Sequence, residues 1–293
     1  MKKKLLCILM SMSCLFCSCN TMTSSSNKIN ESSKTNKTIE KNTSKPSNSS
    51  NINKSDCNLS TKEENWFFKP SKDNKPATIP EDMSTLIDKY SGYFLGNTSK
   101  KHLYLTFDEG YENGYTGKIL DTLKANNIKA AFFVTAPYIK DNKDLIKRME
   151  KEGHLVCNHS DHHPSMASAA LKGKEHFKKE FTVVENLYKE TTGKDIPKFF
   201  RPPMGKYSEM SLAYTKELGY KSIFWSFAYH DWDRNKQPSI EEGKEKILGR
   251  IHNGSIILLH AVSKTNTEIL DDVIKDLKNQ KYEFKTLNEL PEK

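Results

Sequence analysis

Two histidines four positions apart, His159 and His163, form the pattern in this chain that best suits a metal ion. On a helical turn, residues with this spacing lie on one side, so both imidazoles can face the same ion. Two imidazoles and a carboxylate leave positions open for water and substrate, as a hydrolytic metal site requires. The same spacing is common in structural helices, so its meaning depends on the acidic residues that accompany it.

The adjacent carboxylates Asp108 and Glu109 are the acidic candidates. Neighbouring side chains at the end of an extended strand point in opposite directions, so we expect the two to have different roles. One would act as a base on water, and the other would reach the metal or the scaffold. We expect Arg201 to keep Asp108 ionised through a bidentate pair. His260 follows an apolar segment and is a candidate proton donor to a leaving group.

An alternation of strands and helices would bring these residues together. Apolar segments of strand length alternate with segments of helical spacing, which include one long helix expected over residues 168–192. This order predicts an α/β fold, an irregular (β/α)7 barrel with a parallel sheet, and polar clusters at the carboxyl ends of its strands. No Gly-rich dinucleotide loop follows the first strand, which disfavours an open nucleotide-binding sheet. The seven expected strands cover residues 103–107, 130–135, 155–157, 199–200, 221–227, 255–259 and 282–287.

The composition of the chain changes near residue 62. Residues 20–62 are rich in Ser, Asn, Thr and Lys and nearly lack large apolar side chains, which predicts a disordered tether. Most of the net charge of +9 lies in residues 1–62, which contain ten Lys and three acidic residues. Residues 63–293 hold 36 basic and 34 acidic residues and are expected to form one domain, a monomer. This balance argues against a nucleic-acid partner.

The first 19 residues have the pattern of an export signal. Lys2 to Lys4 precede an apolar stretch over residues 5–16 that is too short to span a bilayer comfortably. The stretch ends in a sequence that resembles a bacterial lipobox, in which Cys19 would be lipidated and would anchor the protein to a membrane. Phe16 departs from the usual aliphatic residue of that motif, so cleavage and secretion without a lipid is the alternative.

Five polar clusters follow the predicted strands. In chain order they resemble the motifs of the family-4 carbohydrate esterases, the NodB-homology polysaccharide deacetylases. The resemblance covers about residues 64–290 and implies that family's barrel and its amide-hydrolysing chemistry. The matching segments are residues 106–110 for the TFDDG motif, 159–163 for HSxxH, 201–205 for the Arg-Pro motif, 231–232 for the Asp-Trp motif and 258–260 for Leu-x-His.

The resemblance also implies a role for each matching residue. Asp108 would be the general base and His260 the general acid, with Arg201 and Asp231 supporting them. Trp232 would form an apolar wall for the acetyl methyl group, and Leu258 would also contact substrate. Because Pro202 and Pro203 lack N–H groups, a backbone oxyanion donor from that loop would have to be Met204 or a later residue such as Gly205.

The metal ligands implied by the resemblance are His159, His163 and the residue at position 109. The family has a second Asp where this chain has Glu109, and the extra methylene shifts the carboxylate by about an ångström against tolerances of about 0.2 Å. Glu109 would therefore ligate through a shifted backbone or a water, or it would leave a two-His site. One divalent ion is expected, Zn first, with Co, Mn or Ni also compatible with these ligands.

A narrower similarity points to a substrate. Residues 108–116, 65–67 and 258–263 look like those of the delta-lactam-biosynthetic de-N-acetylases of spore formers. That subgroup removes the acetyl group from peptide-free N-acetylmuramic acid in peptidoglycan, a step toward muramic δ-lactam in the spore cortex. The alternatives are the same reaction on N-acetylglucosamine of peptidoglycan or another glycan and, on account of Glu109, an inactive glycan-binding module.

Overall fold

The structure is a computed structural model and describes residues 58–70 and 73–293. The predicted signal segment 1–19 with Cys19, and the predicted tether up to residue 57, lie outside these residues. Over the part that is described, none of the helices combines the length and the apolar character needed to cross a membrane.

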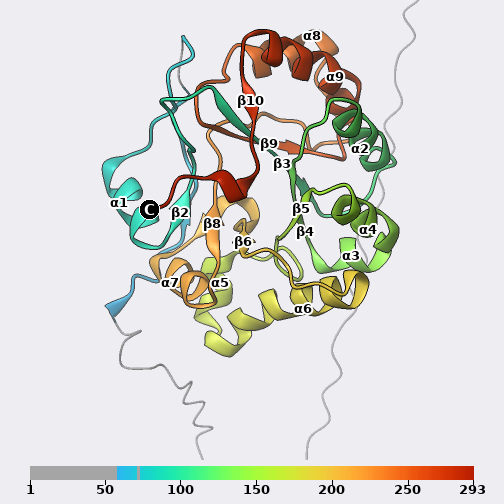
Figure 1. Cartoon of the computed structure of the whole chain (residues 1–293). Coiled ribbons are helices and arrows are strands. Elements are labelled where there is room, and N and C mark those ends of the chain that lie inside the picture. Colours follow the sequence, from blue (N-terminus) through green and yellow to red (C-terminus); the bar gives the residue numbers. More distant parts are fainter. Residues whose placement is uncertain (1–57, 71–72) are drawn as a thin grey trace, which may run out of the picture. The chain divides into compact units, whose positions relative to one another are not determined.

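A parallel sheet forms the centre of the domain and contains all seven predicted strands (Figure 1). Its hydrogen-bonded order is β10-β3-β4-β5-β6-β8-β2. β9 lies off this path and pairs in parallel with β3. The sheet curls because a parallel bridge joins Phe227, just after β8, to Ile257 of β9. This arrangement confirms the predicted irregular barrel. The strands are β2 (Gly92–Tyr93), β3 (His102–Glu109), β4 (Ala131–Val134), β5 (Leu155–Asn158), β6 (Phe199–Phe200), β8 (Lys221–Ile223), β9 (Ser255–His260) and β10 (Glu283–Phe284).

Helices pack around the sheet because the strands β3, β4, β5, β6 and β9 turn apolar side chains outward. In β3, Leu105 and Phe107 belong to the cluster that packs under the helices, whereas Tyr104 belongs to the cluster inside the barrel. Phe107 stacks on Phe132 of β4 with ring centroids 5.2 Å apart. The helices are α2 (Thr116–Ala125), α3 (Ala136–Asp141), α4 (Lys143–Lys151), α5 (Met166–Leu171), α6 (Lys174–Thr192), α7 (Glu209–Glu217), α8 (Ile240–Leu248) and α9 (Lys264–Asn279).

The prediction of a single helix over residues 168–192 is wrong in its first part. The structure has two helices there, α5 and α6, separated at Gly173. Gly173 adopts a φ of 102°, a conformation that a helix cannot contain and that glycine adopts without a steric penalty. The predicted end at Gly193 is confirmed, since this residue has the left-handed conformation typical of a helix C-cap.

The segments before β3 were not predicted, and two of their contacts stabilise the loop that follows β6. β1 (Glu64–Asn65) pairs antiparallel with β7 (Lys206–Tyr207), and the helix α1 (Glu81–Lys89) precedes β2. The N–H of Trp66 donates to the carbonyl of Gly205 at 2.7 Å. The carbonyl of Ser60 accepts from the N–H of Met210 in α7 at 3.0 Å, so contacts with the barrel begin before residue 63.

Candidate active site

The carboxyl ends of the strands surround a cavity of about 810 Å³. Most of the predicted site residues lie in its wall, although they come from five separate segments of the chain. Its lining includes Asp108, His159, His163, Met204, Trp232, Leu258 and His260. The parallel sheet is responsible for this convergence, because all its carboxyl ends open on the same side.

Asp108 lies at the end of β3 with its side chain inside the barrel. Its Oδ1 accepts a hydrogen bond from Nη1 of Arg201 at 2.7 Å. Burial alone would raise the pKa of Asp108, but the positive charge of Arg201, together with His159 and His260, outweighs burial and lowers it. Asp108 is therefore an ionised carboxylate over the ordinary pH range, as a general base must be.

The predicted bidentate pair between Arg201 and Asp108 is wrong. Only Nη1 reaches the carboxylate, while Nε donates to the carbonyl of Ile223 at 3.0 Å and Nη2 is buried without a partner. The guanidinium carbon lies 4.2 Å from the ring centroid of Phe133. The contacts with Ile223 of β8 and with Phe133 hold the guanidinium in an orientation in which Nη1 reaches Asp108 and Nη2 does not.

His159 and His163 meet as predicted, but not on a helical turn. The backbone between them has positive φ values at Ser160 (72°) and at His163 (58°), and the two rings lie with centroids 4.8 Å apart. Nδ1 of His159 lies 2.8 Å from the carbonyl of Arg201. Because a carbonyl only accepts, this nitrogen carries the proton, and Nε2 presents a lone pair.

These two imidazoles fit a divalent metal ion. Burial lowers the pKa of His159 to about 4 and also lowers the pKa of His163, so both rings are neutral and able to ligate. Nε2 of His159 lies 3.5 Å from Oδ2 of Asp108, which places two lone-pair donors opposite each other. Across residues 58–70 and 73–293, no group of three or more His, Cys, Asp or Glu side chains is arranged to hold an ion.

Glu109 does not join the histidines, and its predicted role as a metal ligand is corrected. The pleat of β3 turns its side chain toward the helical layer, where Oε1 lies 3.4 Å from the hydroxyl of Thr116 in α2. Its Oε2 is buried without a partner. Burial, reinforced by the charge of Glu112, raises the pKa of Glu109 well above its usual value. Glu109 thus lies behind the site, in surroundings that favour its neutral form.

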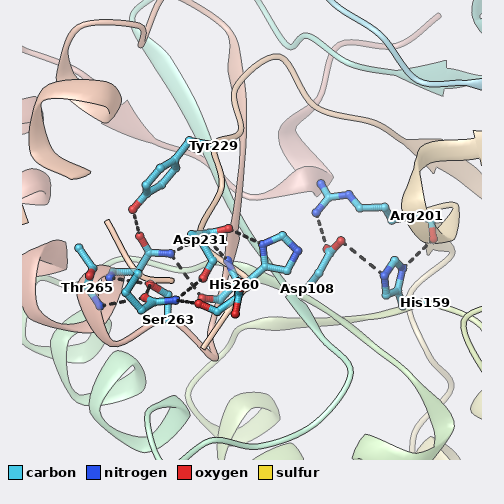
Figure 2. Close-up of polar contacts among 11 residues, drawn as sticks. Asp108, His159, Arg201, Tyr229, Asp231, His260, Ser263 and Thr265 are labelled. Atoms are coloured by element: carbon cyan, nitrogen blue, oxygen red, sulfur yellow. Dashed lines mark hydrogen bonds and ion pairs between the residues drawn. The ribbon is translucent and has the colours of Figure 1, made fainter. Parts of the chain in front are cut away.

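His260 and Asp231 form the second half of the site. Figure 2 shows the His260 ring on the opposite side of Asp108 from His159. Asp231 accepts from Nδ1 of His260 at 2.7 Å and from its backbone N–H at 2.8 Å. Burial would lower the pKa of His260, but Asp231 outweighs burial and raises it. The raised pKa favours the protonated form of His260 in the cavity wall, and Asn266 also donates to Asp231 at 2.5 Å.

The loop after β6 supplies a free backbone donor. The residues of this turn, Pro203–Gly205, include Met204 at a φ of 58°. Gly205 and Lys206 donate to carbonyls within the loop, while the N–H of Met204 makes no hydrogen bond with the described part of the chain. Gly205 is not among the residues that line the cavity, and its N–H already donates to the carbonyl of Pro202. It packs closely instead, since a Cβ there would lie 2.7 Å from Cβ of Trp66.

Several lining residues of the cavity were not singled out from the sequence. Tyr111 is one of them, and it is 45% exposed to solvent, as is the predicted Trp232 at 50%. Tyr111 follows directly on the first acidic cluster, a position that could have identified it. The other lining residues without a predicted role are Gly110, Trp225, Ala228, Tyr229, His230 and Val262.

Comparisons with known proteins agree with this geometry. A family model described as polysaccharide deacetylase matches residues 95–223. The peptidoglycan-N-acetylmuramic acid deacetylase PdaA of Bacillus subtilis is 45% identical over 77% of this chain and 85% of its own length. The solved structure of Bacillus subtilis PdaA, a family 4 carbohydrate esterase, aligns with a TM-score of 0.77 and 43% identity over 79% of this chain and 98% of its own. A peptidoglycan-N-acetylglucosamine deacetylase of Bacillus cereus is 32% identical over 69% of this chain and 72% of its own length.

Proposed function

Because the chain belongs to the polysaccharide deacetylases of carbohydrate esterase family 4, hydrolases of amide bonds, we propose that it removes the acetyl group from N-acetylmuramic acid in peptidoglycan. The sequence identity is 45% with a muramic acid deacetylase and 32% with a glucosamine deacetylase, which supports this choice of sugar. N-acetylglucosamine of peptidoglycan is the second candidate substrate, which the latter relative supports.

One observation carries the proposed chemistry: the carboxylate of Asp108 and the imidazole of His260 lie beside each other, at paired positions of β3 and β9, in the wall of one cavity. The pKa of Asp108 is lowered, which favours the form that a base needs, and the pKa of His260 is raised, which favours the form that an acid needs. Hydrolysis of an acetamide needs a base to take a proton from water and an acid to protonate the departing amine. These two groups provide both.

The remaining residues orient the reaction. Arg201 holds Asp108 and, through its carbonyl, fixes the tautomer of His159. The free N–H of Met204 is oriented by the left-handed turn and would stabilise the negative oxygen of the tetrahedral intermediate. Trp232 and Leu258 give the acetyl methyl an apolar wall. A divalent metal held by His159 and His163, beside Asp108, would supply Lewis-acid polarisation of the acetyl carbonyl when bound.

Further parts of the proposal concern the setting of the reaction. We infer that the substrate is peptide-free muramic acid and that the product amine closes into muramic δ-lactam in the spore cortex. The motif similarities at residues 108–116 and 258–263 support this step. We also infer a monomer that is exported and attached to a membrane through Cys19, on the pattern of residues 1–19.

Acetate release from defined glycans tests the proposal. Peptide-free glycan strands of peptidoglycan should yield acetate with wild-type protein, and oligomers of N-acetylglucosamine should yield much less. The Asp108→Asn variant, which keeps the size of the side chain, is the matched control and should release none above background. Preferential release from the glucosamine oligomers would favour the second candidate. Binding to glycan without acetate release from either would indicate an inactive module.

A further inference from the structure

An exposed cation at the cavity edge has no role in the chemistry described so far. Arg234 lies on the loop that follows Asp231 and Trp232. Its guanidinium carbon lies 5.2 Å from the ring centroid of Tyr111, and Tyr111 is part of the cavity wall. Within residues 58–70 and 73–293, Arg234 forms no ion pair or hydrogen bond, so its five N–H donors are available to a ligand.

The proposed substrate contains an anion that needs such a partner. N-acetylmuramic acid differs from N-acetylglucosamine by a lactyl ether on O3, which ends in a carboxylate. Arg201, which lies inside the barrel, is fully buried and already bound to Asp108, so it is not free to bind this carboxylate. Arg234 is exposed at the cavity edge, on the side of Tyr111, and carries the positive charge that the carboxylate needs.

We propose that Arg234 binds the lactyl carboxylate of N-acetylmuramic acid and so selects this sugar over N-acetylglucosamine. The inference rests on the proposed function and adds the residue that determines specificity. A guanidinium matches a carboxylate with two parallel hydrogen bonds, a geometry that a lysine does not offer. The Tyr111 ring keeps the guanidinium near the cavity before substrate arrives, because a cation is attracted to an aromatic face.

The test compares one substrate in two forms, with and without its negative charge. Peptide-free glycan strands are used as they are and after conversion of the lactyl carboxyls to methyl amides. For wild-type protein, KM should be about tenfold higher for the amidated form, the effect of losing one charge-assisted contact. For Arg234→Gln, KM should be equal for the two forms and close to the wild-type value for the amidated one. Higher ionic strength should raise KM only for wild-type protein with the charged form.

Two further variants separate binding from structure. Lys236→Gln removes a neighbouring exposed charge that has no aromatic contact, and it should keep the wild-type preference. Tyr111→Phe keeps the ring and should also keep the preference, whereas Tyr111→Leu should weaken it.

The outcomes distinguish this inference from the function on which it rests. A wild-type KM that is equal for both forms, or an Arg234→Gln variant that keeps the preference, would overturn the role of Arg234 while the enzyme remains a muramic acid deacetylase. An equal rise in KM for both forms in Arg234→Gln would assign Arg234 a structural role instead. Mass spectrometry of the same strands tests the function separately: loss of acetyl groups from the glucosamine residues alone, with the muramic residues intact, would overturn the proposed function itself.

Discussion

Replacing Asp231 by Asn should lower the pKa of His260 and so favour its neutral imidazole. The two side chains are joined at 2.7 Å, and Asp231 is fully buried. An opposite charge at such a distance typically shifts a pKa by about 1–3 units, which corresponds to about 1.4–4 kcal/mol. Because the shift raises the pKa of His260, the acid form is present below that pKa and is lost as pH rises through it.

The assay for Asp231→Asn is the pH dependence of kcat/KM for acetate release. We expect the alkaline limb to move to lower pH by about 1–3 units. At pH values above the alkaline limbs of both the wild type and the variant, kcat/KM should therefore be about ten- to thousandfold lower in the variant. An Asn oxygen also cannot accept from both the N–H and Nδ1 of His260 and from Asn266, so one buried donor is left unpaired. Thermal unfolding should show a loss of about 1–3 kcal/mol.

A matched control lies two residues along the same loop. Asp233 caps the N–H of Asn235 and does not contact His260, so Asp233→Asn should leave the alkaline limb in place. An alkaline limb in Asp231→Asn that coincides with the wild-type limb would refute the reasoning that Asp231 sets the protonation of His260.

The other predictions concern the carboxylates and the histidine pair. Asp108→Asn should lower kcat by about 10²–10⁴-fold with nearly unchanged metal content, and a full rate would remove Asp108 as the base. His159→Ala should lose both bound metal, measured by elemental analysis, and acetate release, while the exposed His162→Ala should keep both. Glu109→Gln mimics the neutral acid and should keep the metal content and the activity of the wild type. A lower metal content in this variant would show that Glu109 is a metal ligand after all. Because the pKa of Glu109 is raised on folding, its stabilisation is complete below the unfolded-state pKa and is lost as pH rises toward the folded value. The wild-type Tm should therefore fall more with rising pH than that of Glu109→Gln.

Positions at strand ends could be predicted from the sequence because strand length and apolar pattern fix them. Asp108, His159 and His260 each follow an apolar segment, and a parallel sheet brings such positions to one side. The alternation of side chains also predicted that Asp108 and Glu109 face different layers. The resemblance to a family then assigned position 109 to the metal, whereas the pleat places this side chain against Thr116.

Features that depend on packing between distant segments could not be predicted. The two-residue pairing of β1 with β7 leaves no periodic signal, although it fixes the loop that carries Met204. Arg201 reaches Asp108 with Nη1 alone because its bond to the carbonyl of Ile223 orients the guanidinium, and no local pattern reveals that contact. Gly173 divides a continuous amphipathic pattern, since an isolated glycine is compatible with either a helix or a break.

The most direct test of the account is mass spectrometry of peptide-free glycan strands after treatment with the wild-type protein and digestion to disaccharides. Fragmentation assigns each lost acetyl group to one of the two sugars. We predict that the loss falls on the muramic residue, as a free amine or as its δ-lactam, and that Asp108→Asn gives an unchanged spectrum. Loss of acetyl from the glucosamine residue, with the muramic residue intact, would contradict the central claim.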